Sequence, residues 1–209
     1  PEAGRLGVLL QLEDYRQVEL NGSGVRLKAG MMVELGAVAK DYSGDHLAGI
    51  MGKHGVTSAL LSLGGNIHTV GAKPDGSAWR VGISDPMNTE NLLGGVAVID
   101  KAVVTSGSYE RYFEQDGQRY WHILDHETGY PARNGLVSVT VVGESGILCD
   151  GLSTALFVMG IEDALAHYAQ YRDFEAVFVT DAYEVMITPG LEESFFLADG
   201  SSYSLSVVQ

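Results

Sequence analysis

Short runs in which apolar and polar residues alternate recur along most of the chain, and such runs are typical of half-buried strands. Residues 79–86 alternate and stop at a proline, which predicts a strand. Residues 58–65 form a compact apolar run closed by two glycines, and residues 136–144 are rich in β-branched side chains. Each predicts one strand, and residues 94–107 predict a further strand or a pair of strands.

Two segments carry the pattern of a β-hairpin. In residues 109–125, Asp116 and Gly117 stand between two alternating aromatic runs, and an Asp-Gly pair favours a type I′ turn. Residues 175–190 predict a second hairpin, and residues 194–200 predict a last strand. Strands joined by short turns therefore dominate the prediction.

Helical spacing predicts three helices. One side of the segment 37–54 carries Ala39, Ser43, Leu47, Ile50, Met51 and His54. Gly55 follows this segment as a stop signal. Residues 150–160 and 161–171 predict two consecutive helices that are separated by Gly160.

These elements together predict a fold of the α+β class, with largely antiparallel sheets and interspersed helices. Residues 1–209 are expected to form one domain. Residues 25–36 predict only a short strand, a turn at Gly30 and a second extended piece. The chain contains no strand-GxGxxG-helix unit, so a Rossmann nucleotide site is not expected. It also contains no apolar run of about 18 residues, so no transmembrane helix is expected.

The composition is strongly acidic, with a formal net charge of −14. Nucleic-acid phosphates would be repelled by such a chain, so no nucleic-acid partner is expected. If the ligand is a phosphate ester, a local positive charge must offset the repulsion, and a metal cation is the obvious source. The single cysteine, Cys149, excludes a disulfide within the chain.

The first chemical motif is Cys-Asp-Gly-Leu-Ser-Thr-Ala at residues 149–155. On a helix, Asp150 and Thr154 are four positions apart and share one face. A carboxylate and a hydroxyl suit a hard cation such as Mg²⁺. The alternative is structural, with Asp150 as a helix N-cap and Thr154 bonded back to its own helix.

Three further segments combine turns with polar groups. Gly64 and Gly65 follow a predicted strand and allow the backbone to approach a ligand closely, although glycines also end strands routinely. Residues 34–41 place an acid, a turn of small residues and a lysine before a helix. In residues 120–132, His122 is a candidate general base. The alternatives for this last segment are a strand histidine bonded to the backbone and an ordinary polar turn.

The order of these motifs resembles the ApbE family across residues 25–195. The matching segments, in order, are ELGAVAKDY, SLGGNIHTVG, WRVGISDP, TSGSYERYF, HILDHETGYPA, LVSVTVV and CDGLSTALFVMG. The resemblance implies a T-fold-like α+β core and FAD:protein FMN transferase activity. Family members bind FAD with Mg²⁺, transfer FMN to a threonine of a target protein through a phosphoester bond, and release AMP.

The resemblance also implies roles for individual residues. It assigns the metal to the backbone carbonyl of Ala37 and to the side chains of Asp150 and Thr154. It places His122 as the catalytic base and Asp125 as a residue that orients the turn or the histidine. The positions that it assigns to flavin contacts are Glu34, Lys40, Gly64, Gly65, Asn66 and Leu124.

The chain departs from the family pattern at several positions. Asp41 stands where Gly is common, and Ser153 stands where some members carry another acid. His126 stands where many members have Pro. Family members usually carry a further N-terminal portion before the motif that starts at Glu34, and that portion is expected to be missing here.

The resemblance implies an acceptor protein with the motif Asp-Gly-x-Ser/Thr-x-Ala-Thr and an extracytoplasmic, lipid-anchored location. Residues 150–156 of this chain are similar to that motif, but Leu156 occupies the acceptor position, so the segment is interpreted as the metal site. Two alternatives to FMN transfer stay open. One is an Mg²⁺-dependent FAD pyrophosphatase that yields FMN and AMP, and the other is a flavin-binding protein without turnover.

Overall fold

The computed structural model describes residues 3–208 and has a mixed α+β fold built around a seven-stranded sheet. The strand order in this sheet is β14-β12-β11-β10-β7-β4-β3. The strands are β3 (Ala59–Leu63), β4 (Asn66–Val70), β7 (Ala102–Gly107), β10 (Leu136–Gly143), β11 (Glu175–Thr180), β12 (Glu184–Ile187) and β14 (Ser204–Val207). All neighbouring strands are antiparallel except β12 and β14, which are parallel.

Three smaller sheets and four α-helices complete the described structure. A three-stranded antiparallel sheet has the order β13-β6-β5, and two hairpins pair β8 with β9 and β1 with β2. These strands are β1 (Glu19–Asn21), β2 (Gly24–Arg26), β5 (Trp79–Ser84), β6 (Leu92–Val98), β8 (Tyr112–Gln115), β9 (Gln118–Trp121) and β13 (Phe195–Leu197). The helices are α1 (Ala3–Leu10), α2 (Ala39–Lys53), α3 (Gly146–Met159) and α4 (Ile161–Tyr171), with 3₁₀ turns η1 (Tyr15–Gln17) and η2 (Pro189–Leu191).

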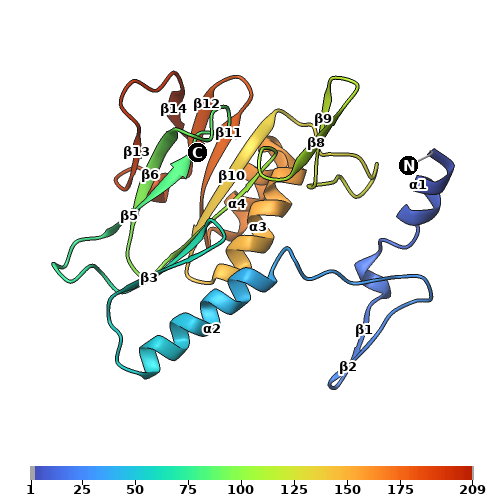
Figure 1. Cartoon of the computed structure of the whole chain (residues 1–209), viewed down its shortest axis with the longest axis horizontal. Coiled ribbons are helices and arrows are strands. Elements are labelled where there is room, and N and C mark those ends of the chain that lie inside the picture. The colour runs from blue at the N-terminus through green and yellow to red at the C-terminus, as the bar shows by residue number, and fades with distance from the viewer. Residues whose placement is uncertain (1–2, 209) are drawn as a thin grey trace.

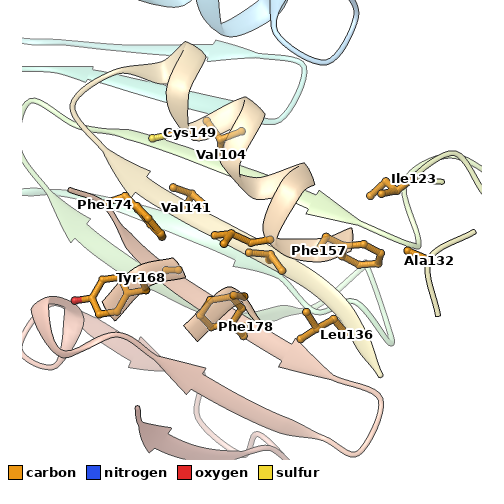
Figure 2. Packing of buried hydrophobic residues seen from close by; sticks show 14 of the residues in the cluster. Val104, Ile123, Ala132, Leu136, Val141, Cys149, Phe157, Tyr168, Phe174 and Phe178 are labelled. Atoms are coloured by element: carbon orange, nitrogen blue, oxygen red, sulfur yellow. The ribbon is translucent and has the colours of Figure 1, made fainter. Parts of the chain in front are cut away.

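The central strands β7, β10 and β11 are largely buried on both faces because they carry apolar side chains at successive positions. Val104, Val141 and Phe178 belong to a cluster with residues of α3 and α4, including Phe157. Figure 2 shows these four side chains converging between α3 and the strands. The adjacent positions on the strands, such as Val142, belong to a second cluster with residues of β5, β6 and β13. The sheet therefore lies between a helical layer and a smaller sheet.

Helix α2 packs against α3, β4 and β3, and the chain before it leaves the sheets. Figure 1 shows residues 3–38 as an arm, in blue, that extends away from the sheets and carries α1 and the β1–β2 hairpin. None of the helices within residues 3–208 combines the length and the apolar character needed to cross a membrane.

The α+β class and the dominance of antiparallel strands are confirmed. The β8–β9 hairpin turns at Asp116 and Gly117 with φ values of 52° and 74°, and two positive φ values define the predicted type I′ turn. The segment 94–107 forms two strands in two different sheets, β6 and β7.

Some local expectations were wrong. The helix predicted over 37–54 is present as α2, but the side that carries Leu47 and Ile50 is not its buried side, since each of these residues is 39% exposed. The buried residues of this helix are Asp41 and Gly44, because the helix packs a polar cluster against β4. The extended piece after Gly30 forms no strand, and α3 begins at Gly146, four positions before the predicted start.

Candidate active site

Seven of the eleven residues predicted for the site line one pocket of about 320 Å³. The pocket lies where the start of α2, the end of β7, the segment after β9 and the middle of α3 meet. The predicted residues that line it are Glu34, Ala37, Lys40, His122, Leu124, Asp150 and Thr154. These residues lie up to 120 positions apart in the chain (34 to 154), so the fold alone brings them together.

His122 is held at the pocket by the residue that follows it. Ile123 is 4% exposed and packs into the core cluster with Ala132 and Phe157. Both neighbours of Ile123, His122 and Leu124, line the pocket, as expected for residues that alternate along an extended segment. The backbone N–H of His122 donates to the carbonyl of Arg111 at 3.1 Å, and its ring Nδ1 lies 3.3 Å from the same oxygen.

Asp125 lies in the turn that follows and does not line this pocket. Its carboxylate accepts hydrogen bonds from the backbone N–H of Glu127 at 2.8 Å and from the hydroxyl of Thr128 at 3.1 Å. The backbone of Asp125 also accepts from Gly129 and donates to Tyr130. These bonds close the turn after Leu124, so the contacts of Asp125 are those of a turn-orienting residue.

Asp150 and Thr154 project from α3 toward β7. Ser145 caps this helix, and its hydroxyl accepts a hydrogen bond from the backbone N–H of Leu148, so Asp150 is not the N-cap. The Thr154 hydroxyl lies 3.0 Å from the Ser106 hydroxyl and 3.4 Å from the carbonyl oxygen of Asp150. Thr154 therefore makes the bond to its own helix that the structural alternative expected, and it also contacts β7.

The carboxyl group of Asp150 is buried and only partly satisfied. Asp150 is 6% exposed, and its Oδ2 atom accepts no hydrogen bond within residues 3–208. Burial and, next to it, the interaction with the Asp41 carboxylate together raise the pKa of Asp150 to about 7. Burial also opposes ionisation of Asp41, but its hydrogen bonds with His68, Asp150 and Asn66 outweigh burial and hold its pKa below the ordinary value.

A hard divalent cation fits this chemistry. The predicted donors are all oxygens, and a buried carboxylate oxygen without a partner is a group that either a proton or a cation must satisfy. No group of three His, Cys, Asp or Glu side chains with metal-binding geometry occurs among the described residues. The predicted set does not need one, because two of its three donors are the carbonyl of Ala37 and the hydroxyl of Thr154.

Mg²⁺ is expected to raise the melting temperature more at about pH 8 than at about pH 5.5, because it competes with a proton at Asp150. Because the pKa of Asp150 is raised to about 7, the metal-free folded state keeps this proton at pH values between its ordinary pKa and about 7, where the unfolded state has lost it. This group therefore lowers the stability as the pH rises from about 4 to about 7, and a bound cation restores it. Melting curves with Mg²⁺ and with EDTA at both pH values measure the difference. An equal Mg²⁺ effect at both pH values contradicts the expectation.

The remaining flavin positions lie beside the pocket. Gly64 and Gly65 form the turn of the β3–β4 hairpin, with φ values of 59° and 99° that favour glycine. A side chain added at Gly64 would lie 3.7 Å from the Lys40 side chain, so the turn is close to a pocket residue. Asn66 is 4% exposed, and its amide donates to the carboxylate of Asp41.

Six pocket residues were not predicted. Gly36 and Ile123 are next to predicted residues, and the other four are Thr105, Ser106, Glu110 and Arg111. These last four lie in the segment TSGSYERYF, residues 105–113, for which the sequence predicted no individual site residue. Burial raises the pKa of Glu110, while the nearby charges of Lys40, His122 and Arg111 lower it. The alternation of β7, with Thr105 and Ser106 partly buried after three buried apolar residues, was the signal that could have revealed them.

Comparisons with known proteins find relatives over most of this chain. A model of the ApbE family matches residues 1–178. A FAD:protein FMN transferase of Klebsiella pneumoniae is 37% identical over 192 residues, which cover 90% of this chain and 59% of the relative. A Treponema pallidum protein of the same name is 36% identical, over 95% of this chain and 60% of its own length.

Two solved structures share the fold. The ApbE protein of Thermotoga maritima superposes with a TM-score of 0.81 and 32% identity, over 88% of this chain and 61% of that one. The flavin transferase ApbE of Vibrio cholerae gives a TM-score of 0.73 and 28% identity, over 95% and 60% of the two chains. This chain thus spans about three fifths of the length of these relatives. Since the family model covers most of the residues and the fold agrees, the chain belongs to the ApbE family.

Proposed function

We propose that this chain transfers FMN from FAD to a threonine hydroxyl of a target protein in a reaction that depends on Mg²⁺. The observation that carries the proposal is the single pocket in which His122 faces the same space as Asp150 and Thr154. A base for a hydroxyl and oxygen donors for a cation are the two groups that transfer of a phosphoryl-linked nucleotide requires. The names of the relatives, FAD:protein FMN transferase, support the same activity.

Asp150, Thr154 and the carbonyl of Ala37 would hold the cation. Bound there, Mg²⁺ would offset the charge of the pyrophosphate and polarise the phosphoryl group that is attacked. The chain itself supplies Lys40 and Arg111 at the pocket, and their charges attract an anionic substrate into a protein of net charge −14. Leu124 gives the pocket an apolar contact for the nucleotide, and it is 50% exposed.

The imidazole of His122 would accept the proton of the threonine hydroxyl as that oxygen attacks phosphorus. Its position supports this role, since Ile123 anchors the segment in the core and the Arg111 carbonyl fixes the backbone of His122. A base held this way loses little freedom when the substrate binds, which favours the reaction. The turn closed by Asp125 would keep Leu124 and His122 on the pocket side.

Incubation with FAD, Mg²⁺ and a peptide that carries Asp-Gly-x-Ser/Thr-x-Ala-Thr tests the proposal. Transfer gives a fluorescent flavin on the peptide and an equal amount of AMP. Equal amounts of FMN and AMP with an unlabelled peptide would instead establish an FAD pyrophosphatase. FAD that is bound and recovered unchanged would establish a flavin-binding protein without turnover. A peptide with Thr replaced by Val is the control, because it lacks the hydroxyl that attacks.

A further inference from the structure

A buried histidine lies between two carboxylates directly behind the proposed cation site. His68, on β4, is 3% exposed. Its Nε2 atom lies 2.9 Å from Oδ1 of Asp41, and its Nδ1 atom lies 3.4 Å from Oδ1 of Asp45. Asp41 is fully buried and comes from the first turn of α2, and Asp45 follows one turn later.

Two glycines make room for the imidazole ring. A Cβ atom added at Gly44, on α2, would collide with the His68 ring, with Cε1 only 2.5 Å away. A Cβ atom added at Gly146, the first residue of α3, would also collide with the imidazole, 2.8 Å from Nε2. The ring therefore occupies a slot between two helices that any larger residue at either glycine would close.

The same cluster joins the ends of three elements. Asp45 accepts hydrogen bonds from the backbone N–H of Gly146 at 2.7 Å and of Ile147 at 3.1 Å, at the start of α3. The hydroxyl of Ser145 donates to Asp45 at 3.1 Å. On the other side, Asn66 of β4 donates to Asp41. α2, β4 and α3 are thus fixed to one another by hydrogen bonds to two carboxylates.

Asp150 lies one turn further along α3 from this anchored start, and the buried carboxylate of Asp41 is close enough to raise the pKa of Asp150. Its Oδ2 atom has no partner among the described residues, whereas each Asp41 oxygen has one. We propose that Asp41 is a positioning residue, held by Asn66 and His68, whose buried negative charge favours a divalent cation at the carboxylate of Asp150. This inference rests on the cation site of the proposed function.

The buried charge of Asp41 argues for this role over a purely stabilising one. A buried charge is costly unless it is hydrogen-bonded, and apolar replacements of buried ionic groups are often as stable as the original. Stability alone therefore gives little reason for a carboxylate, an amide and an imidazole in the interface between α2 and α3. Residues that support metal ligands typically change metal affinity by about 10–100-fold when they are replaced.

Titration of the metal-free protein with Mn²⁺, followed by the EPR signal of free Mn²⁺, measures the affinity of the site without any substrate. Asp41→Asn keeps the shape of the side chain and removes its charge, and it is expected to weaken Mn²⁺ binding by about 10–100-fold. Circular dichroism and a cooperative melt establish that the variant is folded. A folded Asp41→Asn protein whose Mn²⁺ affinity stays within about threefold of the original overturns the proposal.

Two replacements of His68 test the same link if Asp41→Asn does not fold. The amide nitrogen of Gln can occupy the position of Nε2 and donate to Asp41, whereas the shorter Asn can reach only the position of Nδ1, near Asp45. His68→Asn is expected to weaken Mn²⁺ binding, and His68→Gln is expected to restore most of it. Equal affinities of these two variants contradict the proposal, because a structural role alone predicts no difference in cation binding.

Thr188→Val is the matched control for lost stability. Thr188 is fully buried and its hydroxyl accepts from the backbone N–H of Ala176 at 2.9 Å, in the part of the sheet around β11 and β12. Its replacement is expected to lower the melting temperature and leave Mn²⁺ affinity unchanged. Since the readout is metal binding alone, the inference can fail while FMN transfer is observed. It can equally hold in a protein that only hydrolyses or binds FAD.

Discussion

Asp150→Ala is expected to abolish the Mg²⁺-dependent turnover of FAD, with a loss on the order of 10³-fold or more. Asp150 supplies the only charged side chain among the three predicted cation donors, since Ala37 contributes a carbonyl and Thr154 a hydroxyl. Its Oδ2 atom accepts no hydrogen bond within the described residues, so the replacement leaves no buried donor without an acceptor at that atom. The loss should therefore appear in metal binding and turnover more than in folding.

Release of AMP from FAD, measured across a range of Mg²⁺ concentrations, checks this expectation. Thr154→Val keeps the carboxylate and removes one neutral donor, so a smaller loss that excess Mg²⁺ partly recovers is expected. Asp163→Ala, in the exposed first turn of α4, is the control for removing an acid from the same helical layer. Turnover in Asp150→Ala that equals the original at every Mg²⁺ concentration would remove Asp150 from the cation site.

Much of this site could be predicted because several of its residues belong to short sequence patterns. Asp150 and Thr154 are one helical turn apart, and the strand that ends just before His122 is recognisable from the Asp116–Gly117 turn. Such patterns depend on neighbours within a few positions, which is the range in which sequence periodicity is informative. The motif order then placed Glu34, Lys40 and Leu124, and the fold gathers them around the same pocket.

The polar cluster behind the pocket could not be predicted in this way. Asp41 was noticed only as a departure from a common glycine, and β4, which carries His68, was not predicted as a strand. Asp41 and His68 are 27 positions apart, and Asp45 meets Gly146 across 101 positions, so no local period links them. The same lack of a local signal explains why β14 was not predicted. Its parallel pairing with β12 depends on the chain returning to the edge of the sheet.

His122→Ala is expected to slow FMN transfer by about 10²–10⁴-fold and to leave FAD binding nearly unchanged, because a base acts on the hydroxyl of the acceptor. The side chain is exposed and His122 is held by its backbone N–H and by Ile123, so its loss does not open the core. Single-turnover labelling of the acceptor peptide gives the rate, and quenching of FAD fluorescence gives the affinity. Added imidazole should restore part of the rate, since the truncated side chain leaves space for it at the pocket.

His126→Ala is the matched control for this prediction. His126 lies four positions later in the same segment, is exposed, and does not line the pocket of Asp150. Its loss should leave both the rate and FAD affinity unchanged, which separates catalysis by His122 from a general effect of removing a histidine here. If His122→Ala instead weakens FAD binding in proportion to the lost rate, His122 binds the nucleotide. The proton of the threonine must then pass to another group, and Glu110, a pocket carboxyl whose charge interacts with that of His122, is the next candidate.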